Sequence, residues 1–144
     1  MDHLPLTAAR KILAGAFAKA AELRLKPLGI AVLDARGVLK AFEMQDDAPG
    51  LVRPDIARGK AFGALAIGAG SRALHQRMQQ GSPLLAAMMQ ATGGQLVPVP
   101  GGVLVRDQAG RLLGAVGVTG DSSDNDEAVA VAGITAAGLA AETG

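Results

Sequence analysis

Apolar side chains in the first third of the chain follow two different spacings. Over residues 7–26 they recur every three or four positions, which predicts an amphipathic helix that Thr7 caps and Pro27 ends. Residues 29–33 are apolar without interruption, as expected of a strand that is covered on both faces. After a turn that starts with aspartate and ends with glycine, residues 38–44 return as a second strand. The two strands therefore form an antiparallel hairpin.

Glycine and proline divide the middle of the chain into three predicted helices. A helix over residues 54–67 has proline at its first position, and Asp55 lies near the positive end of its dipole. Ser71 caps a second helix over residues 71–79, and a third helix spans residues 83–91. The glycines between these segments mark where each helix ends.

The last third of the chain is predicted to contain three short strands and a helix. The strands are residues 96–99, 103–106 and 111–119, and the helix runs from residue 125 or 126 to about 141. Tight turns join the strands within each group, which favours antiparallel pairing. The economical packing of these elements is a five-stranded antiparallel sheet with helices on both faces, a fold of the α+β class.

Composition excludes several classes of function. The 144 residues suffice for a single domain over residues 1–144, and a net charge of +1 gives no basic patch for nucleic acid. No apolar run is long enough to cross a membrane, and the absence of cysteine excludes thiolate chemistry and fits a cytoplasmic location. We expect neither nucleic acid nor a membrane as partner. The many Ala, Val, Leu and Gly residues leave smooth apolar surface, which favours a homo-oligomer, either a dimer or larger.

Four carboxylates follow the last predicted strand within seven residues: Asp121, Asp124, Asp126 and Glu127. They could hold a ligand, but their spacing does not match an EF-hand, and two isolated histidines offer no zinc site. The alternative is a helix N-terminus, in which residue 124 or 125 is the cap and the next carboxylates complement the dipole. Both interpretations hold if Asp121 faces a pocket. We expect no metal site, and we expect Asp121 and Glu127 to contact a ligand.

Lys60 lies in a stripe of small residues on the predicted helix over residues 54–67. If it is partly buried near carboxylates, it could act as an acid or base with Asp121 as its partner. The protein would then be a cofactor-independent isomerase, lyase or hydrolase that acts on a small oxygenated metabolite. The alternative is a solvated or structurally paired lysine. Asp55 could contact a ligand, or it could pair with Arg58 one turn later.

A Pro-Gly-Gly corner precedes the strand predicted at residues 103–106. The backbone N–H groups of Gly101 and Gly102 could approach a ligand carboxylate, with Pro100 making the approach rigid. The alternative is a tight strand corner, and a phosphate loop is excluded because the corner leads into a strand. Met44 ends the second strand beside a polar loop, where it could face a pocket or belong to the core.

Three blocks of sequence carry a resemblance to a known family. They are AVLDARGVLKAFEMQDD, PDIARGKAFGALAIGAGSRAL and LVPVPGGVLVRDQAGRLLGAVGVTGDSSDNDEAVAVAGI, after an Ala-rich first helix. In this order they resemble the GlcG/HbpS-like family of heme-binding domains, which includes the C-terminal domain of PduO-type proteins. The likeness extends from about Leu6 to Leu139. It implies a profilin-like α/β/α sandwich, symmetric oligomers from dimers upward, and heme binding in some members.

The cofactor that this resemblance implies is heme, with no cofactor as the alternative, and heme iron needs an axial donor. Without cysteine or tyrosine, the chain offers His3, His75 and five methionines. His3 lies near the terminus, so His75 is the axial candidate, and its alternative is a solvated imidazole. We expect a small-molecule or heme-binding protein, accessory to a catabolic or heme-related pathway, with its ligand at the sheet end. The expected ligand-binding residues are Met44, Asp55, Lys60, Pro100, Gly101, Gly102, Asp121 and Glu127.

Overall fold

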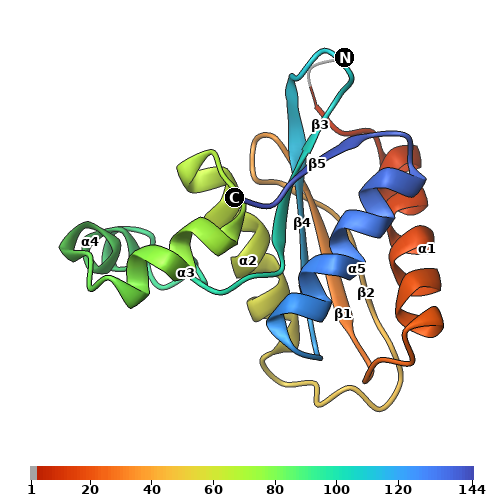
Figure 1. Ribbon diagram of the computed structural model, residues 1–144, viewed down its shortest axis with the longest axis horizontal. Coiled ribbons are helices and arrows are strands. Elements are labelled where there is room, and N and C mark those ends of the chain that lie inside the picture. The colour runs from red at the N-terminus through yellow and green to blue at the C-terminus, as the bar shows by residue number, and fades with distance from the viewer. Residues whose placement is uncertain (1–2) are drawn as a thin grey trace.

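Helices cover both faces of one central sheet in the computed structural model, which describes residues 3–144 (Figure 1). The strands are β1 (Gly29–Asp34), β2 (Leu39–Met44), β3 (Gly102–Arg106), β4 (Leu112–Thr119) and β5 (Ala140–Glu142). Their order across the sheet is β2-β1-β4-β3-β5, and each neighbouring pair is antiparallel. This architecture confirms the predicted α+β class and α/β/α sandwich.

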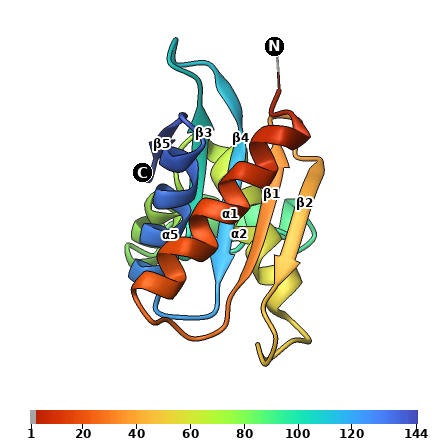
Figure 2. The ribbon, with the colours of Figure 1, turned by 90° about the vertical axis from the view of Figure 1, so that its right-hand side faces the viewer.

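Two helices cover one face of the sheet and one helix covers the other. The helices are α1 (Leu6–Glu22), α2 (Arg53–Ile67), α3 (Ser71–Gln79), α4 (Pro83–Ala91) and α5 (Ser123–Ala136). α1 and α5 lie side by side on one face, as Figure 2 shows, and α2 lies on the opposite face. α3 and α4 extend outward from the α2 side (Figure 1). Within residues 3–144, none of these helices is long and apolar enough to span a membrane.

The buried side chains form a layer on each side of the sheet. Ile30 and Val32 of β1 belong to a cluster with Ile134 of α5, whereas Leu33 packs with Ala61 of α2. Every position of β1 is buried, as its uninterrupted apolar run predicted. Each fully buried Ile, Leu or Val contributes about 1.5–3 kcal/mol, so these two layers supply the main force that holds the helices on the sheet.

Glycines in β3 and β4 bring α2 into direct contact with the strand backbone. A Cβ at Gly117 would overlap the carbonyl of Ala57, and a Cβ at Gly102 would overlap the carbonyl of Lys60. Only glycine permits this distance between helix and sheet. As a consequence, a side chain on the inner face of α2 starts close to the sheet and can reach past the end of a strand.

Two predicted elements are wrong. Residues 96–99 form no strand, because this segment crosses α2, where the N–H of Val97 donates to the carbonyl of Gly59 at 3.2 Å. The fifth strand is β5, which lies where the end of the last helix was predicted. α5 ends at Ala136, and Gly138 with φ 75° redirects the chain so that β5 pairs with β3.

The bounds of the three middle helices follow the predictions within one residue, whereas the capping residues of α1, α3 and α5 differ from those predicted. The N-cap of α1 is Pro5, so Thr7 lies inside the helix, which ends at residue 22 rather than 26. Ser71 is the first residue of α3 and makes no cap hydrogen bond. α5 begins at residue 123, because the hydroxyl of Ser122 accepts from the N–H of Asn125 and is its cap.

Candidate functional site

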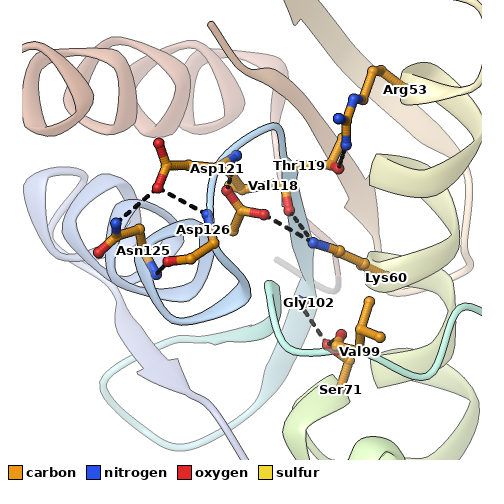
Figure 3. Close-up of polar contacts among 11 residues, drawn as sticks. Arg53, Lys60, Ser71, Val99, Gly102, Val118, Thr119, Asp121, Asn125 and Asp126 are labelled. Atoms are coloured by element: carbon orange, nitrogen blue, oxygen red, sulfur yellow. Dashed lines mark hydrogen bonds and ion pairs between the residues drawn. The ribbon is translucent and has the colours of Figure 1, made fainter. Parts of the chain in front are cut away.

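Lys60 is the centre of a buried polar cluster at the end of β4 (Figure 3). Its side chain is 3% exposed, and its Nζ donates to Oδ2 of Asp126 at 3.0 Å and to the carbonyl of Val118 at 2.9 Å. Asp126 lies on the first turn of α5 and is equally buried. Because α2 and α5 lie on opposite faces of the sheet, this ion pair joins the two helix layers past the start of β3.

The charge of Lys60 is held in a dry environment. Burial lowers the pKa of the Lys60 ammonium, because leaving water disfavours the charged form. The carboxylate of Asp126 acts in the opposite direction and raises this pKa, while the Arg53 guanidinium lowers it further. Arg53 lies at the edge of the cluster, where it donates to the hydroxyl of Thr119 at 3.0 Å. Two of the three N–H groups of the ammonium are therefore bound by oxygen atoms of the protein itself.

The predicted Pro-Gly-Gly corner belongs to the same cluster and has the geometry of a strand corner. Gly101 has a φ of 119°, and a Cβ there would lie 2.9 Å from Nζ of Lys60. The N–H of Gly102 donates to Oγ of Ser71 at 2.8 Å, and that hydroxyl donates to the carbonyl of Val99 at 2.6 Å. Pro100 and both glycines are buried. The lack of side chains at the two glycines of this corner leaves room for Lys60 to extend from one helix layer to the other. The N–H of Gly102 already donates to Ser71 and therefore does not face a ligand.

Asp121 lies beside the cluster and does not pair with Lys60. Its backbone N–H donates to Oδ1 of Asp126 at 3.0 Å. Its carboxylate accepts from the side chain of Asn125 at 2.8 Å and from two backbone N–H groups, one of them that of Lys26 at 3.0 Å. The Asn125 contact and these backbone contacts lower the pKa of Asp121 to about 2. The predicted pairing is therefore corrected: the partner of Lys60 is Asp126, which points inward from α5, while Asp121 in the preceding loop holds the backbone.

Glu127 directly follows Asp126 on α5 and pairs with α3, and His75 lies on α3. Glu127 accepts from Arg72 of α3 at 3.0 Å, and Arg72 also pairs with Asp124. His75 is half-buried, and its Nδ1 is buried with no hydrogen-bond partner among residues 3–144. Within this same range, no three His, Asp or Glu side chains are gathered as a metal site.

Three cavities lie outside the cluster. The Met44 cleft, with a volume of about 510 Å³, lies between the end of α1 and the end of β2, and its lining is Phe17, Leu25, Pro27, Glu43, Met44, Gln45 and Asp46. The α2 cavity, of about 550 Å³, lies between α2 and residues 93–97 and includes Asp55 in its lining. A smaller cavity of about 270 Å³ lies beside His3. Lys60, Glu127 and His75 line none of the three.

The Met44 cleft and Asp121 lie at the same end of the sheet. Met44 and Thr119 both pair with Gly29 of β1, on its two sides. The backbone of Lys26, which the carboxylate of Asp121 holds, lies between two residues that line the cleft, Leu25 and Pro27. Asp121 is therefore a positioning residue for one wall of the cleft. Of the predicted ligand residues, Met44 lines the cleft, Asp55 lines the α2 cavity, and Lys60 lies in the buried cluster with the Pro-Gly-Gly corner. Glu127 pairs with Arg72 outside all three.

Asp126 is the functional neighbour of Lys60 that sequence reasoning missed. Asp126 precedes three buried residues of α5, Val129, Ala130 and Gly133, by three, four and seven positions, which is the spacing of one helix face. A carboxylate on the apolar face of a helix at that spacing is a signal of a buried partner. Asp121 carries no such signal, because it lies in the loop before the helix.

Comparisons with known proteins agree over nearly the whole chain. A family model described as haem degrading protein HbpS-like matches residues 4–135. An uncharacterized 15.0 kDa protein of Citrobacter freundii, from a dhaT-dhaS intergenic region, is 31% identical over 127 residues, which cover 88% of this chain and 87% of that protein. A crystal structure of a PduOC:heme complex has a TM-score of 0.84 and 26% identity and covers 95% of this chain and 96% of that one. A double mutant of Streptomyces reticuli HbpS has a TM-score of 0.77 and 29% identity, with coverage of 94% and 87%.

Proposed function

Because this chain belongs to the HbpS-like haem-degrading protein family, we propose that it binds heme in the Met44 cleft, as an accessory protein of a catabolic or heme-related pathway. The observation that carries the proposal is the lining of the cleft. A methionine thioether stands there with the apolar side chains of Phe17, Leu25 and Pro27 around about 510 Å³. Methionine sulfur is an axial ligand that heme iron accepts, and apolar walls suit the faces of a porphyrin.

The lining of the cleft combines one thioether donor and three apolar side chains with the polar side chains of Glu43, Gln45 and Asp46. Met44 is partly exposed and lines the cleft. Arg24 and Lys26 flank Leu25 in the chain and are exposed, so cations for heme carboxylates stand beside an apolar wall. A bound heme would supply an iron centre whose potential and ligand binding depend on its axial donor and on the polarity around it. The heme in the PduOC complex supports the same class of ligand.

Hemin titration tests the cleft against His75, the axial candidate from the sequence. We expect the wild-type chain to shift the Soret band of hemin, and Met44→Ala to weaken that binding at least tenfold. His75→Ala should bind as the wild type does. Met78→Ala is a matched control, because Met78 is 43% exposed and Met44 is 40% exposed, and Met78 lies on α3 outside the cleft.

Three results would contradict the proposal. The wild-type chain could leave the Soret band unchanged. His75→Ala could abolish the shift while Met44→Ala retains it. Both variants could bind as the wild type does, which would place the heme elsewhere.

No observation favours the alternative of an acid/base enzyme. Lys60 is engaged by Asp126 and Val118 and lines none of the three cavities. The carboxylate of Asp121 is occupied by hydrogen bonds and is held in its ionised form. Neither group is presented to a substrate in this arrangement.

We further propose that the chain associates with copies of itself and functions in the cytoplasm. Support for self-association comes from large apolar side chains that face solvent, among them Leu51, Val52 and Leu84. Surfaces of this kind mark contact sites when they are contiguous. The lack of cysteine supports a reducing compartment.

A further inference from the structure

The N-terminal half of α2 and the residues just before it form a surface that fits a second copy of the same surface. We infer that two chains pair about a twofold axis there, each inserting Leu51 into the α2 cavity of the other. The inference rests on the self-association proposed above and assigns its interface. It is independent of the Met44 cleft and of heme.

This surface has an exposed apolar side chain, that of Leu51, next to the opening of the α2 cavity. Leu51 is 95% exposed, more than any other large apolar side chain in residues 3–144. The neighbouring α2 cavity, of about 550 Å³, is lined by Val52, Ile56, Phe62 and Val97. In a twofold contact, the same patch of each chain must provide both the projection and the cavity. This surface provides both.

The rim of the cavity carries one acidic and one basic side chain, so the rims of two copies can be complementary in charge. Asp55 and Arg58 lie one turn apart on α2 and are exposed. The ion pairs found within residues 3–144 include neither of them. When two copies of a helix pack antiparallel about a twofold axis, residues equally distant from the axis face each other. An axis between residues 56 and 57 therefore places Asp55 of each chain opposite Arg58 of the other.

Leu51 lies two residues before α2, and it is as far from this axis along the chain as Phe62, so the same register brings Leu51 of one chain toward Phe62 of the other. Phe62 is one of the apolar residues that line the cavity. A single axis thus pairs both charges and buries the exposed leucine. A small molecule in the cavity would leave Leu51 in water and both charges unpaired, so a second copy accounts for more of the surface.

Sedimentation velocity of the full chain tests the interface. The wild type should associate reversibly, and Leu51→Ser should raise the dissociation constant of the twofold contact about a hundredfold. The twofold axis buries this leucine twice, so its loss counts twice, and a hundredfold change corresponds to about 2.8 kcal/mol. Leu39→Ser is the matched control, because Leu39 is a half-exposed leucine on the edge strand β2. Far-UV circular dichroism verifies that each variant is folded.

Charge reversal gives the sharper result. Asp55→Arg and Arg58→Asp should each weaken association, since each places like charges opposite one another. The double reversal should restore association, because it exchanges the two partners of the same pair. A wild-type chain that remains monomeric overturns both self-association and this interface. An oligomer that Leu51→Ser leaves intact, or a double reversal that restores nothing, overturns the interface alone.

Discussion

Replacing Asp126 with asparagine should leave the charge of Lys60 buried without its partner. Asparagine keeps the shape of the side chain but only one of its two acceptor oxygens, which can accept from the N–H of Asp121 or from Lys60 but not from both. The change therefore removes one charge and one acceptor next to Nζ of Lys60, which lies 3.0 Å from the carboxylate. Removing one partner of a buried ion pair costs about 3–5 kcal/mol. The total unfolding free energy of a domain is about 5–15 kcal/mol, so Asp126→Asn should remove a large share of it.

Urea unfolding followed by far-UV circular dichroism measures this loss, because the chain contains neither Trp nor Tyr for fluorescence. Asp124→Asn is the control. It removes the same charge from the same helical turn, but the side chain of Asp124 is 82% exposed and pairs with Arg72 at the surface. Such a pair contributes at most about 1 kcal/mol. The reasoning is refuted if Asp126→Asn costs no more than Asp124→Asn at an unchanged m-value.

The pH dependence of the same variant provides a second check. Burial holds the pKa of Lys60 in the folded state below its ordinary value of 10.5. Between these two pKa values the unfolded chain binds more protons, so the unfolding free energy rises with pH across that window. The carboxylate of Asp126 raises the pKa of Lys60 in the folded state, so Asp126→Asn should lower that pKa further and extend the pH window to lower pH. Its deficit should therefore be smaller at about pH 10 than at about pH 7, and an equal deficit at both would contradict this account.

Three further changes should affect stability in ways that thermal or pH unfolding can measure. Ser71→Ala removes the hydroxyl that binds two backbone groups, one of them the N–H of Gly102, and should cost about 1–3 kcal/mol for each group left unpaired. Gly102→Ala should destabilise strongly, because its Cβ would overlap the carbonyl of Lys60, and an unchanged melting temperature would argue against the close helix–sheet contact. Asp121→Asn should lower the free energy of unfolding above the ordinary carboxyl pKa of 3.8. The deficit should shrink as pH falls from 3.8 toward 2 and vanish only below pH 2, because the folded-state pKa of Asp121 is about 2.

Local patterns predicted most of the fold because most of its elements are specified by local spacing. The apolar run of β1 is buried throughout, and Gly and Pro mark the ends of the three middle helices. The two errors arose where tertiary contacts decide. Residues 96–99 are flanked and interrupted by proline, which cannot donate to a strand ladder, and they pair with α2 instead. β5 has three residues, too few for any period to be visible.

The candidate site was less predictable, because a sequence shows which residues are chemically able and not which of them meet. Lys60 was singled out from its small neighbours, and the structure shows it buried and paired with Asp126, which is the alternative of a structurally paired lysine. Its partner could have been any of four carboxylates, and the choice depends on how α5 begins. Ser122 as the cap turns Asp126 inward and leaves Asp121 in the loop. The apolar spacing after Asp126 was the one sequence signal that favours it.

Replacing both members of the Lys60–Asp126 ion pair distinguishes the contribution of their charges to stability from the contribution of their hydrogen bonds to the backbone. If the pair were isolated, two apolar residues of similar volume would be neutral or stabilising. This pair is not isolated, because Asp126 also accepts the N–H of Asp121, and Lys60 also donates to the carbonyl of Val118. Lys60→Met with Asp126→Leu would leave both backbone groups without partners, at about 1–3 kcal/mol each. We therefore expect the double variant to unfold at lower urea than the wild type. A variant as stable as the wild type would show that the hydrogen bonds to the backbone of Asp121 and Val118 add no stability and that the pair behaves as an isolated one.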